Sequence, residues 1–242
     1  MKATASQRRN VIGPWGVVGV ILATFLLACG AQGAPVRSGS GFFISAHGEL
    51  LTNFHVASNC KSLSVWPPGQ PMRKAHIIGL DRDTDLALLG SPESPQRFGR
   101  ISSIMAAKPG TPVHIIGYGA DQIRPRSANV SHGYILEGTS DNTLHIAAHL
   151  VPGNSGGPVI DKTGHIVGII FGRVAKNPMI SLARSAERIR GFLASHHVNI
   201  TQDDTTTDGI NLISELLNIS ALIQCVPNTP MRQSPRRNNS KK

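Results

Sequence analysis

A serine flanked by glycines lies in the stretch Pro152-Gly-Asn-Ser-Gly-Gly-Pro158. Glycine neighbours leave the backbone N–H groups unobstructed, so these groups can bind an oxygen that gains negative charge when the serine attacks a carbonyl. A serine hydroxyl is a weak nucleophile and needs a neighbouring base, usually a histidine that a carboxylate orients. The stretch therefore indicates acyl transfer by Ser155, with a histidine and an acid as partners.

Two upstream stretches offer these partners. The first, Leu51-Thr-Asn-Phe-His-Val56, places His55 at the end of a predicted strand. The second, Asp81-Arg-Asp-Thr-Asp-Leu-Ala-Leu-Leu89, places Asp85 at the start of another strand. Because side chains two apart share one face of a strand, Asp83 is the alternative acid in this run.

Two other kinds of site share part of these patterns. The aspartates at 81, 83 and 85 begin like a calcium-binding EF-hand loop, but the sixth position is Leu86 and the twelfth is Pro92, where that loop needs Gly and Glu. The glycines around Ser155 also fit the nucleophile elbow of α/β-hydrolases, in which the acid and the histidine follow the serine. Here His55 and Asp85 both precede Ser155, so we expect a hydrolase with a serine nucleophile on another fold. We expect it to need no metal and no cofactor.

Short apolar runs separated by Gly, Pro, Asn and Ser predict strands of an all-β sandwich or barrel. The predicted strands are Gly41–Ile44, Leu50–Phe54, Leu63–Trp66, Ala75–Gly79, Leu86–Leu89, Val113–Gly117, Gly133–Leu136, Thr143–Ala147, Val159–Ile160 and His165–Phe171. Asp161-Lys-Thr-Gly164 predicts a tight turn between the last two. Apolar periodicity predicts a helix over Ala183–Leu193 and a second amphipathic helix over Ile210–Ile223.

In this order the stretches resemble the trypsin-like (chymotrypsin-fold) serine endopeptidases, particularly the bacterial HtrA/Do-like branch. The resemblance covers roughly residues 38–193. It rests on Gly39-Ser-Gly-Phe-Phe-Ile44, Leu51-Thr-Asn-Phe-His-Val56, Thr84-Asp-Leu-Ala-Leu-Leu89, Pro152-Gly-Asn-Ser-Gly-Gly-Pro158 and Gly164-His-Ile-Val-Gly-Ile169.

The resemblance implies an all-β fold of two packed six-stranded antiparallel barrels with the site between them, followed by a C-terminal helix. It assigns Ser155 as the nucleophile, His55 as general acid and base, and Asp85 as the group that orients His55. The backbone N–H groups of Gly153 and Ser155 would form the oxyanion hole.

The resemblance also places the pocket for the substrate side chain near His149 and the substrate-pairing strand at Phe171, Gly172 and Arg173. A histidine at the pocket base could favour acidic or amide side chains in the substrate. A structural role for His149 stays equally open.

Three features depart from the family pattern. Digestive relatives carry an acid at the position of Asn154, which pairs with a freed N-terminus, so we expect no activation by N-terminal cleavage. Only about twenty residues separate a cleaved N-terminus from His55, so we expect the first barrel to lack an opening strand. HtrA proteins usually add a PDZ domain, and the residues after Ser195 are too few for one.

Residues 1–33 have a basic start, an apolar run and a small-residue exit, as in an export signal. They indicate either a cleaved signal peptide or a retained membrane anchor, and Cys29 lies in a lipobox-like stretch where it would carry lipid. The mature chain is expected outside the cytoplasm: periplasmic, anchored to the cell envelope or secreted. An oxidising compartment would allow a disulfide between Cys60 and Cys225, although the sequence does not show that they are close.

The formal charge of +10 lies mainly at the two ends of the chain. Three basic residues fall in 1–33 and five in the acid-free tail, which leaves 16 against all 14 acids. This balance is ordinary, so we expect no nucleic-acid partner. The predicted organisation is a protease domain over 34–200, then a linker, a short helix and a basic disordered tail over 201–242.

Together these features predict an exported serine endopeptidase that cleaves polypeptide substrates through an acyl-enzyme. The alternative is a catalytically inactive trypsin-fold binding module of the cell envelope.

Overall fold

The computed structural model of the chain describes residues 36–92, 94–103, 108–119, 127–137, 143–198, 200 and 212–228. The predicted export segment with Cys29, the linker after residue 200 and the basic tail lie outside these residues. No helix within the described ranges is long and apolar enough to span a membrane.

The first barrel is a closed ring of six antiparallel strands in the order β1-β13-β3-β4-β5-β2. Its inner face is apolar, with side chains such as Phe43, Leu50 and Val65 almost fully buried. The strands are β1 (Arg37–Phe43), β2 (Glu49–Thr52), β3 (Cys60–Trp66), β4 (Arg73–Asp81), β5 (Leu86–Gly90) and β13 (Ser220–Pro227), and the short helix α1 (Phe54–Ala57) follows β2.

The second barrel runs in the order β10-β7-β8-β9-β12-β11, and the pairing of β10 with β11 closes the ring. Its strands are β7 (Pro112–Gly117), β8 (Asn129–Ile135), β9 (Thr143–Ala147), β10 (Pro158–Asp161), β11 (His165–Val174) and β12 (Asn177–Ser185). A two-residue strand, β6 (Arg100–Ile101), pairs in parallel with the start of β11. The predicted fold of two six-stranded antiparallel barrels is therefore confirmed.

Two helices pack into a core that both barrels share. These helices are α2 (Ala186–Ser195), which Ser185 caps by accepting from the Arg188 N–H, and α3 (Leu212–Ile219). The shared core joins Leu88 of the first barrel and Ile169 of the second to Phe192 of α2 and Leu216 of α3. The barrels are thus held together by apolar packing from helices as well as from strands.

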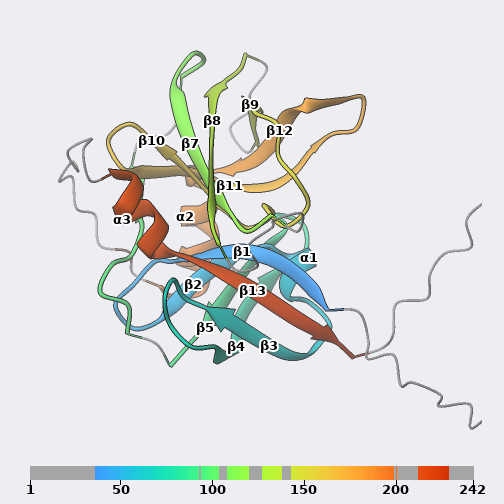
Figure 1. The fold of residues 1–242 in the computed structure, drawn as a ribbon, viewed down its shortest axis with the longest axis vertical. Coiled ribbons are helices and arrows are strands. Elements are labelled where there is room, and N and C mark those ends of the chain that lie inside the picture. Colours follow the sequence, from blue (N-terminus) through green and yellow to red (C-terminus); the bar gives the residue numbers. More distant parts are fainter. Residues whose placement is uncertain are drawn as a thin grey trace, which may run out of the picture. The chain divides into compact units, whose positions relative to one another are not determined.

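The largest difference from the sequence prediction lies at the C-terminal end. The stretch Ile210–Ile223 is not one helix, because α3 ends at Ile219 and the chain continues as the strand β13. β13 lies between β1 and β3 (Figure 1). Residues 37–90 supply only five strands, so the expected shortage of a strand is real, and the C-terminal segment fills it.

A disulfide fastens this strand to its neighbour. Cys225 of β13 and Cys60 of β3 have their sulfurs 1.97 Å apart and their Cα atoms 5.4 Å apart. The sequence prediction left this pairing open, and the pairing of β13 with β3 is what brings the two residues together.

Smaller differences concern element bounds. The helix predicted from Ala183 begins at Ala186, because residues up to Ser185 complete β12, a strand that the sequence prediction missed together with β6. The predicted turn before β11 is present, with the Gly164 N–H donating to the Asp161 carbonyl at 3.1 Å.

Candidate active site

His55 and Asp85 form a hydrogen-bonded pair on the first barrel. His55 Nδ1 lies 2.8 Å from Asp85 Oδ2, and the backbone N–H of His55 donates to Asp85 Oδ1 at 3.0 Å. Since a carboxylate only accepts, Nδ1 carries the proton in this contact and Nε2 is left as an acceptor. The His55 side chain is about half exposed and that of Asp85 is 19% exposed, so the ring faces solvent while the acid lies behind it.

The backbone around Asp85 fixes the direction of its carboxylate. Asp85 has a φ of 56°, in the left-handed region that aspartate tolerates better than most residues. Its carbonyl accepts from Asn53 Nδ2 at 2.9 Å and from the Phe54 N–H at 3.2 Å. The loop before β5 is thereby bonded to α1, the helix that carries His55.

The other aspartates of the run do not share a face with Asp85, because β4 ends at Asp81 and a turn follows. Asp81 Oδ1 accepts from the N–H groups of Asp83 and Thr84. Burial works to raise the pKa of Asp81, but these hydrogen bonds together with the charge of Arg188 leave it below its ordinary value. Asp83 is exposed, and the structure places Asp85, not the alternative Asp83, on His55.

Arg184 of β12 supports the same loop from the second barrel. Its Nε donates to the Thr84 carbonyl at 2.8 Å, and its guanidinium lies over the Phe171 ring, 4.2 Å from the centroid. Burial lowers the pKa of Arg184, and the negative charge of Asp85 acts in the opposite direction. A cation of the second barrel therefore lies beside the acid of the first.

The Ser155 segment forms a tight turn with a glycine in the left-handed region. The Asn154 N–H donates to the Val151 carbonyl at 3.2 Å, and Gly153, third in this turn after Pro152, has a φ of 98°. Proline second and a positive-φ glycine third are typical of a type II turn. Within the described residues, the N–H groups of Gly153 and Ser155 donate to no acceptor.

Asn154 holds this turn from inside. Its side chain is 3% exposed, and its Oδ1 accepts from the Val151 N–H at 3.3 Å. Gly117, at the end of β7, lies so close that a Cβ there would be 2.5 Å from Asn154 Nδ2. The amide thus fills the position without the charged partner that an aspartate would need.

Ser40 of β1 fastens the turn to the first barrel. Its N–H donates to the Ser155 carbonyl at 2.7 Å, and its hydroxyl donates to the Gly153 carbonyl at 2.7 Å. The same hydroxyl accepts from the Tyr118 N–H at 2.8 Å, and the Ser40 side chain is fully buried. Ser40 of the first barrel therefore positions both Gly153, in the turn, and Ser155, which follows the turn.

Gly39 shows how near the two halves of the site lie. A Cβ on Gly39 would be 2.6 Å from Cγ2 of Val56, the neighbour of His55, and 3.1 Å from the carbonyl oxygen of Ser155. The segments that carry His55 and Ser155 thus touch the same glycine. Of the three residues predicted for catalysis, His55 and Asp85 are in direct contact, and the segment of Ser155 lies against the same glycine as the neighbour of His55.

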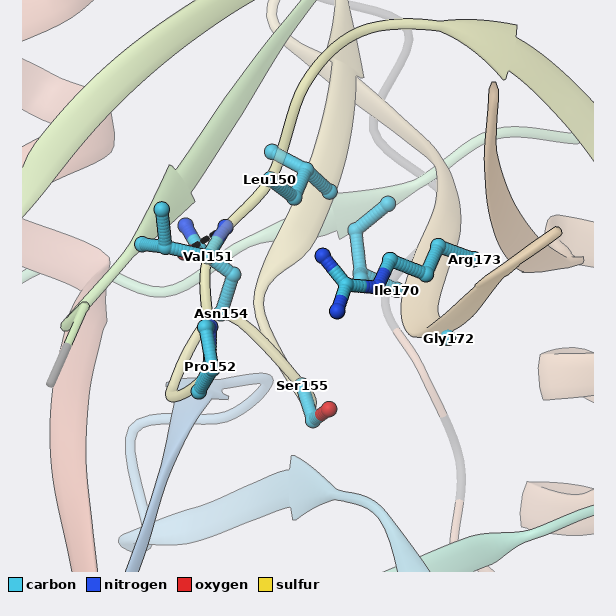
Figure 2. A pocket seen from close by; sticks show the side chains of 8 residues that line it. All are labelled: Leu150, Val151, Pro152, Asn154, Ser155, Ile170, Gly172 and Arg173. Atoms are coloured by element: carbon cyan, nitrogen blue, oxygen red, sulfur yellow. Dashed lines mark hydrogen bonds between the residues drawn. The ribbon is translucent and has the colours of Figure 1, made fainter. Parts of the chain in front are cut away.

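A pocket of about 440 Å³, counting the solvent at its mouth, opens beside Ser155 (Figure 2). Residues of the Leu150–Ser155 segment line one side, and Ile170, Gly172 and Arg173 of β11 line the other. Of the predicted substrate-binding residues, Gly172 and Arg173 line it. His149 is exposed and is not among the lining residues, so a role for it in substrate binding stays a prediction.

Phe171 does not line the pocket either, because its ring contacts Arg184. β11 and β12 shift register between the pairs Ile170–Ala183 and Gly172–Leu182, which leaves Phe171 as the extra residue of a β-bulge. Bulges next to active sites commonly redirect side chains in this way.

The sequence prediction missed the supporting residues, Ser40, Asn53 and Arg184. Only Ser40 had a signal, as a small polar residue between two glycines at the start of a strand. Across the described ranges no cluster of three or more His, Cys, Asp or Glu residues could hold a metal ion.

Comparison with known proteins agrees with this geometry. The profile of the trypsin-like peptidase domain matches residues 39–169, more than half of the chain. The chain belongs to this family. Its match extends from the glycine beside Ser40, through His55, Asp85 and Ser155, to the strand that lines the pocket.

Individual relatives of this trypsin-like peptidase include proteins of the HtrA type. An uncharacterized protein y4bJ of Sinorhizobium fredii is 33% identical over 147 residues, which are 59% of this chain and 23% of that protein. Human serine protease HTRA4 is 29% identical over 69% of this chain and 37% of its own length. The chain thus spans well under half the length of these curated relatives. The likeness to HTRA4 confirms the predicted resemblance to HtrA proteases.

Among solved structures, the inactive form of the Rv3671c protease, from Mycobacterium tuberculosis H37Rv, superimposes with a TM-score of 0.59 at 26% identity. The match covers 67% of this chain and 87% of that one.

Proposed function

We propose that the chain is a serine endopeptidase that hydrolyses peptide bonds of extended polypeptides through an acyl-enzyme. The observation that carries this proposal is the 2.8 Å contact of His55 Nδ1 with Asp85 Oδ2. Val56, the neighbour of His55, lies against Gly39, and so does the carbonyl oxygen of Ser155. Membership of the trypsin-like peptidase family supports it. The choice of polypeptides as substrates is also proposed, because this chain aligns with only part of the length of its relatives.

In the proposed reaction, Ser155 Oγ attacks the carbonyl carbon of the substrate while His55 Nε2 accepts the hydroxyl proton. Asp85 accepts a hydrogen bond from the Nδ1–H group of His55 and stabilises the imidazolium that forms. The imidazolium then donates its proton to the leaving amine, which releases the first product. A water molecule, deprotonated by His55, hydrolyses the ester on Ser155 and restores the enzyme.

The Gly153 turn is suited to the negative charge that develops on the substrate oxygen. The N–H groups of Gly153 and Ser155 have no acceptor within the described residues, so they can donate to that oxygen. Removing one such donor in other proteases costs about 2.7–4 kcal/mol of transition-state stabilisation.

Replacing the nucleophile tests the proposal. Wild type should cleave casein and react with a fluorophosphonate probe, and Ser155→Ala should lose labelling and at least about 10⁴-fold in activity. Ser38→Ala, at an exposed position of β1, is the matched control and should behave as wild type.

A further pair of variants tests the acid. Asp85→Asn should lower kcat by about 10⁴-fold, as loss of the orienting carboxylate does in this mechanism. Asp83→Asn, at an exposed neighbouring position, should leave kcat unchanged. A folded wild type that neither labels nor cleaves would instead be the inactive binding module.

We also propose that the chain acts outside the cytoplasm. The basic and apolar start of residues 1–33 supports export, and the Cys60–Cys225 disulfide is of a kind that persists in oxidising compartments. Fractionation of expressing bacteria should find the protein in the envelope or medium with no free thiol on these cysteines. Cytoplasmic protein with both thiols reactive would overturn this proposal.

A further inference from the structure

The pocket beside Ser155 is where a substrate side chain would enter. Ser155 itself forms part of its wall, and Figure 2 shows the serine hydroxyl at its edge. If Ser155 attacks the carbonyl of a peptide bond, the residue that carries this carbonyl places its side chain in the nearest pocket. The chemistry of the lining therefore determines which residue precedes the cleaved bond.

Arg173 is the one charged residue among those that line the pocket. The other lining residues are apolar or neutral, among them Leu150, Ile170 and Asn154. Figure 2 shows the guanidinium reaching from β11 across the pocket toward the Val151–Asn154 segment. Its positive charge thus lies where the end of a bound side chain would lie.

No partner within the described residues satisfies this guanidinium. The Arg173 side chain makes no hydrogen bond or ion pair there, whereas Arg97 binds Glu215 at 2.9 Å and Arg184 binds the Thr84 carbonyl. An arginine presents donors in a planar fork that matches a carboxylate with two parallel hydrogen bonds. A carboxylate from the substrate is the complementary group.

We propose that Arg173 makes this pocket selective for an acidic side chain, Asp or Glu, at the residue before the cleaved bond. The inference rests on the proposed function, since it assigns the substrate class of the same site. The acidic preference that the sequence suggested through His149 is thereby assigned to a different residue.

The position of Arg173 sets the size of the effect. Its side chain is exposed, so water and salt screen the contact more than in a closed pocket. We expect roughly a tenfold higher kcat/KM for Glu than for the isosteric Gln, equal to about 1.4 kcal/mol. Raising the salt concentration from 0.05 M to 0.5 M should reduce this ratio.

The first experiment measures kcat/KM on peptides that differ only at the residue before the cleaved bond, with Asp, Glu, Gln, Leu or Lys there. Wild type should prefer Asp or Glu. Arg173→Met should bring the Glu/Gln ratio close to one, and Arg173→Glu should reverse the preference in favour of Lys. Lys176→Met removes an equal charge from the exposed β11–β12 turn and should keep the wild-type ratio.

A wild-type Glu/Gln ratio near one would overturn the inference. A strong preference for Leu that Arg173→Glu leaves unchanged would also overturn it. Either result, with Ser155 still labelled by fluorophosphonate, leaves the proposed function standing.

A second measurement does not depend on catalysis. Ser155→Ala protein binds the same uncleaved peptides, and fluorescence anisotropy gives their Kd values. Tighter binding of the Glu peptide than of the Gln peptide, lost in Ser155→Ala/Arg173→Met, supports the carboxylate site even if wild type proves inactive. Equal Kd values for both peptides would reject the site whatever the activity.

Discussion

The second barrel takes its six strands from residues 112–185, whereas the first takes five strands from residues 37–90 and the sixth from residues 220–227. The second therefore closes through pairings within one continuous part of the chain. The first closes only when β13 has paired with both β1 and β3 (Figure 1). This difference means that the barrel carrying His55 and Asp85 depends on the far end of the protein.

The two barrels also support each other's half of the site. Ser40, from the first barrel, holds the Gly153–Ser155 turn of the second. Arg184, from the second barrel, holds the Thr84 carbonyl next to Asp85 of the first. The candidate site is thus supported from both barrels, and loss of β13 should affect Ser155 as well as His55.

Removing β13 should have the largest effect. A chain that ends at residue 211 loses α3 and β13 together with their buried side chains, such as Leu216 and Ile223. It exposes the apolar residues that packed against them and leaves β1 and β3 each with one unpaired edge. Each large buried aliphatic side chain is worth about 1.5–3 kcal/mol, so the loss approaches a typical total stability of 5–15 kcal/mol.

We therefore expect that chain to be insoluble or unfolded by circular dichroism. A chain that ends at Asn228 keeps every described strand and should unfold at the wild-type temperature. A folded, active chain ending at residue 211 would show that the first barrel closes without β13.

The disulfide should have the next largest effect. Cys60 and Cys225 are 165 residues apart, and loop-closure entropy for such a separation corresponds to about 5 kcal/mol. Cys225→Ser should lower the free energy of unfolding, measured by urea denaturation, by about this amount. A reductant should do the same to wild type. Reductant should then have no further effect on Cys225→Ser, and a wild type indifferent to reductant would contradict the prediction.

Ser40→Ala should separate positioning from stability. The change leaves the buried Tyr118 N–H without its acceptor and the Gly153 carbonyl without its donor, at a cost of about 1–3 kcal/mol. Because the turn that carries Gly153 and Ser155 loosens, kcat should fall by about tenfold with little change in KM. Stopped-flow acylation and steady-state assays measure this split.

Ser38→Ala, two residues earlier on the exposed side of β1, is the control for Ser40→Ala. Lower stability with unchanged kcat would mean that Ser40 only packs the interface between the barrels.

The sequence predicted those parts that local pattern determines. The strand Thr143–Ala147 and the Asp161–Gly164 turn lie where their apolar runs and turn residues indicated. β13 was not predicted, because the sequence of a strand does not show which other strands pair with it. The apolar run that begins in α3 also continues through β13, so the two elements read as one helix. The direction of Arg173 likewise depends on the bulge at Phe171, which only the β11–β12 register reveals.

The smallest predicted effect is on the second barrel and depends on pH. His114 of β7 and His132 of β8 pair across the strands with their Nδ1 atoms 3.0 Å apart. Burial and then the charge of His132 lower the pKa of His114 from its ordinary 6.5. The unfolded chain therefore takes up a proton at a higher pH than the folded one, so stability is complete above about pH 6.5 and declines as the pH falls below it.

Since His114 is only partly buried, the effect should be about one degree in the unfolding temperature between pH 7.5 and 5.5. His114→Gln should lose that part of the pH dependence, while His47→Gln, at an exposed loop position of the first barrel, should keep it. Equal slopes for wild type and His114→Gln would show that His114 contributes nothing to the pH dependence of stability.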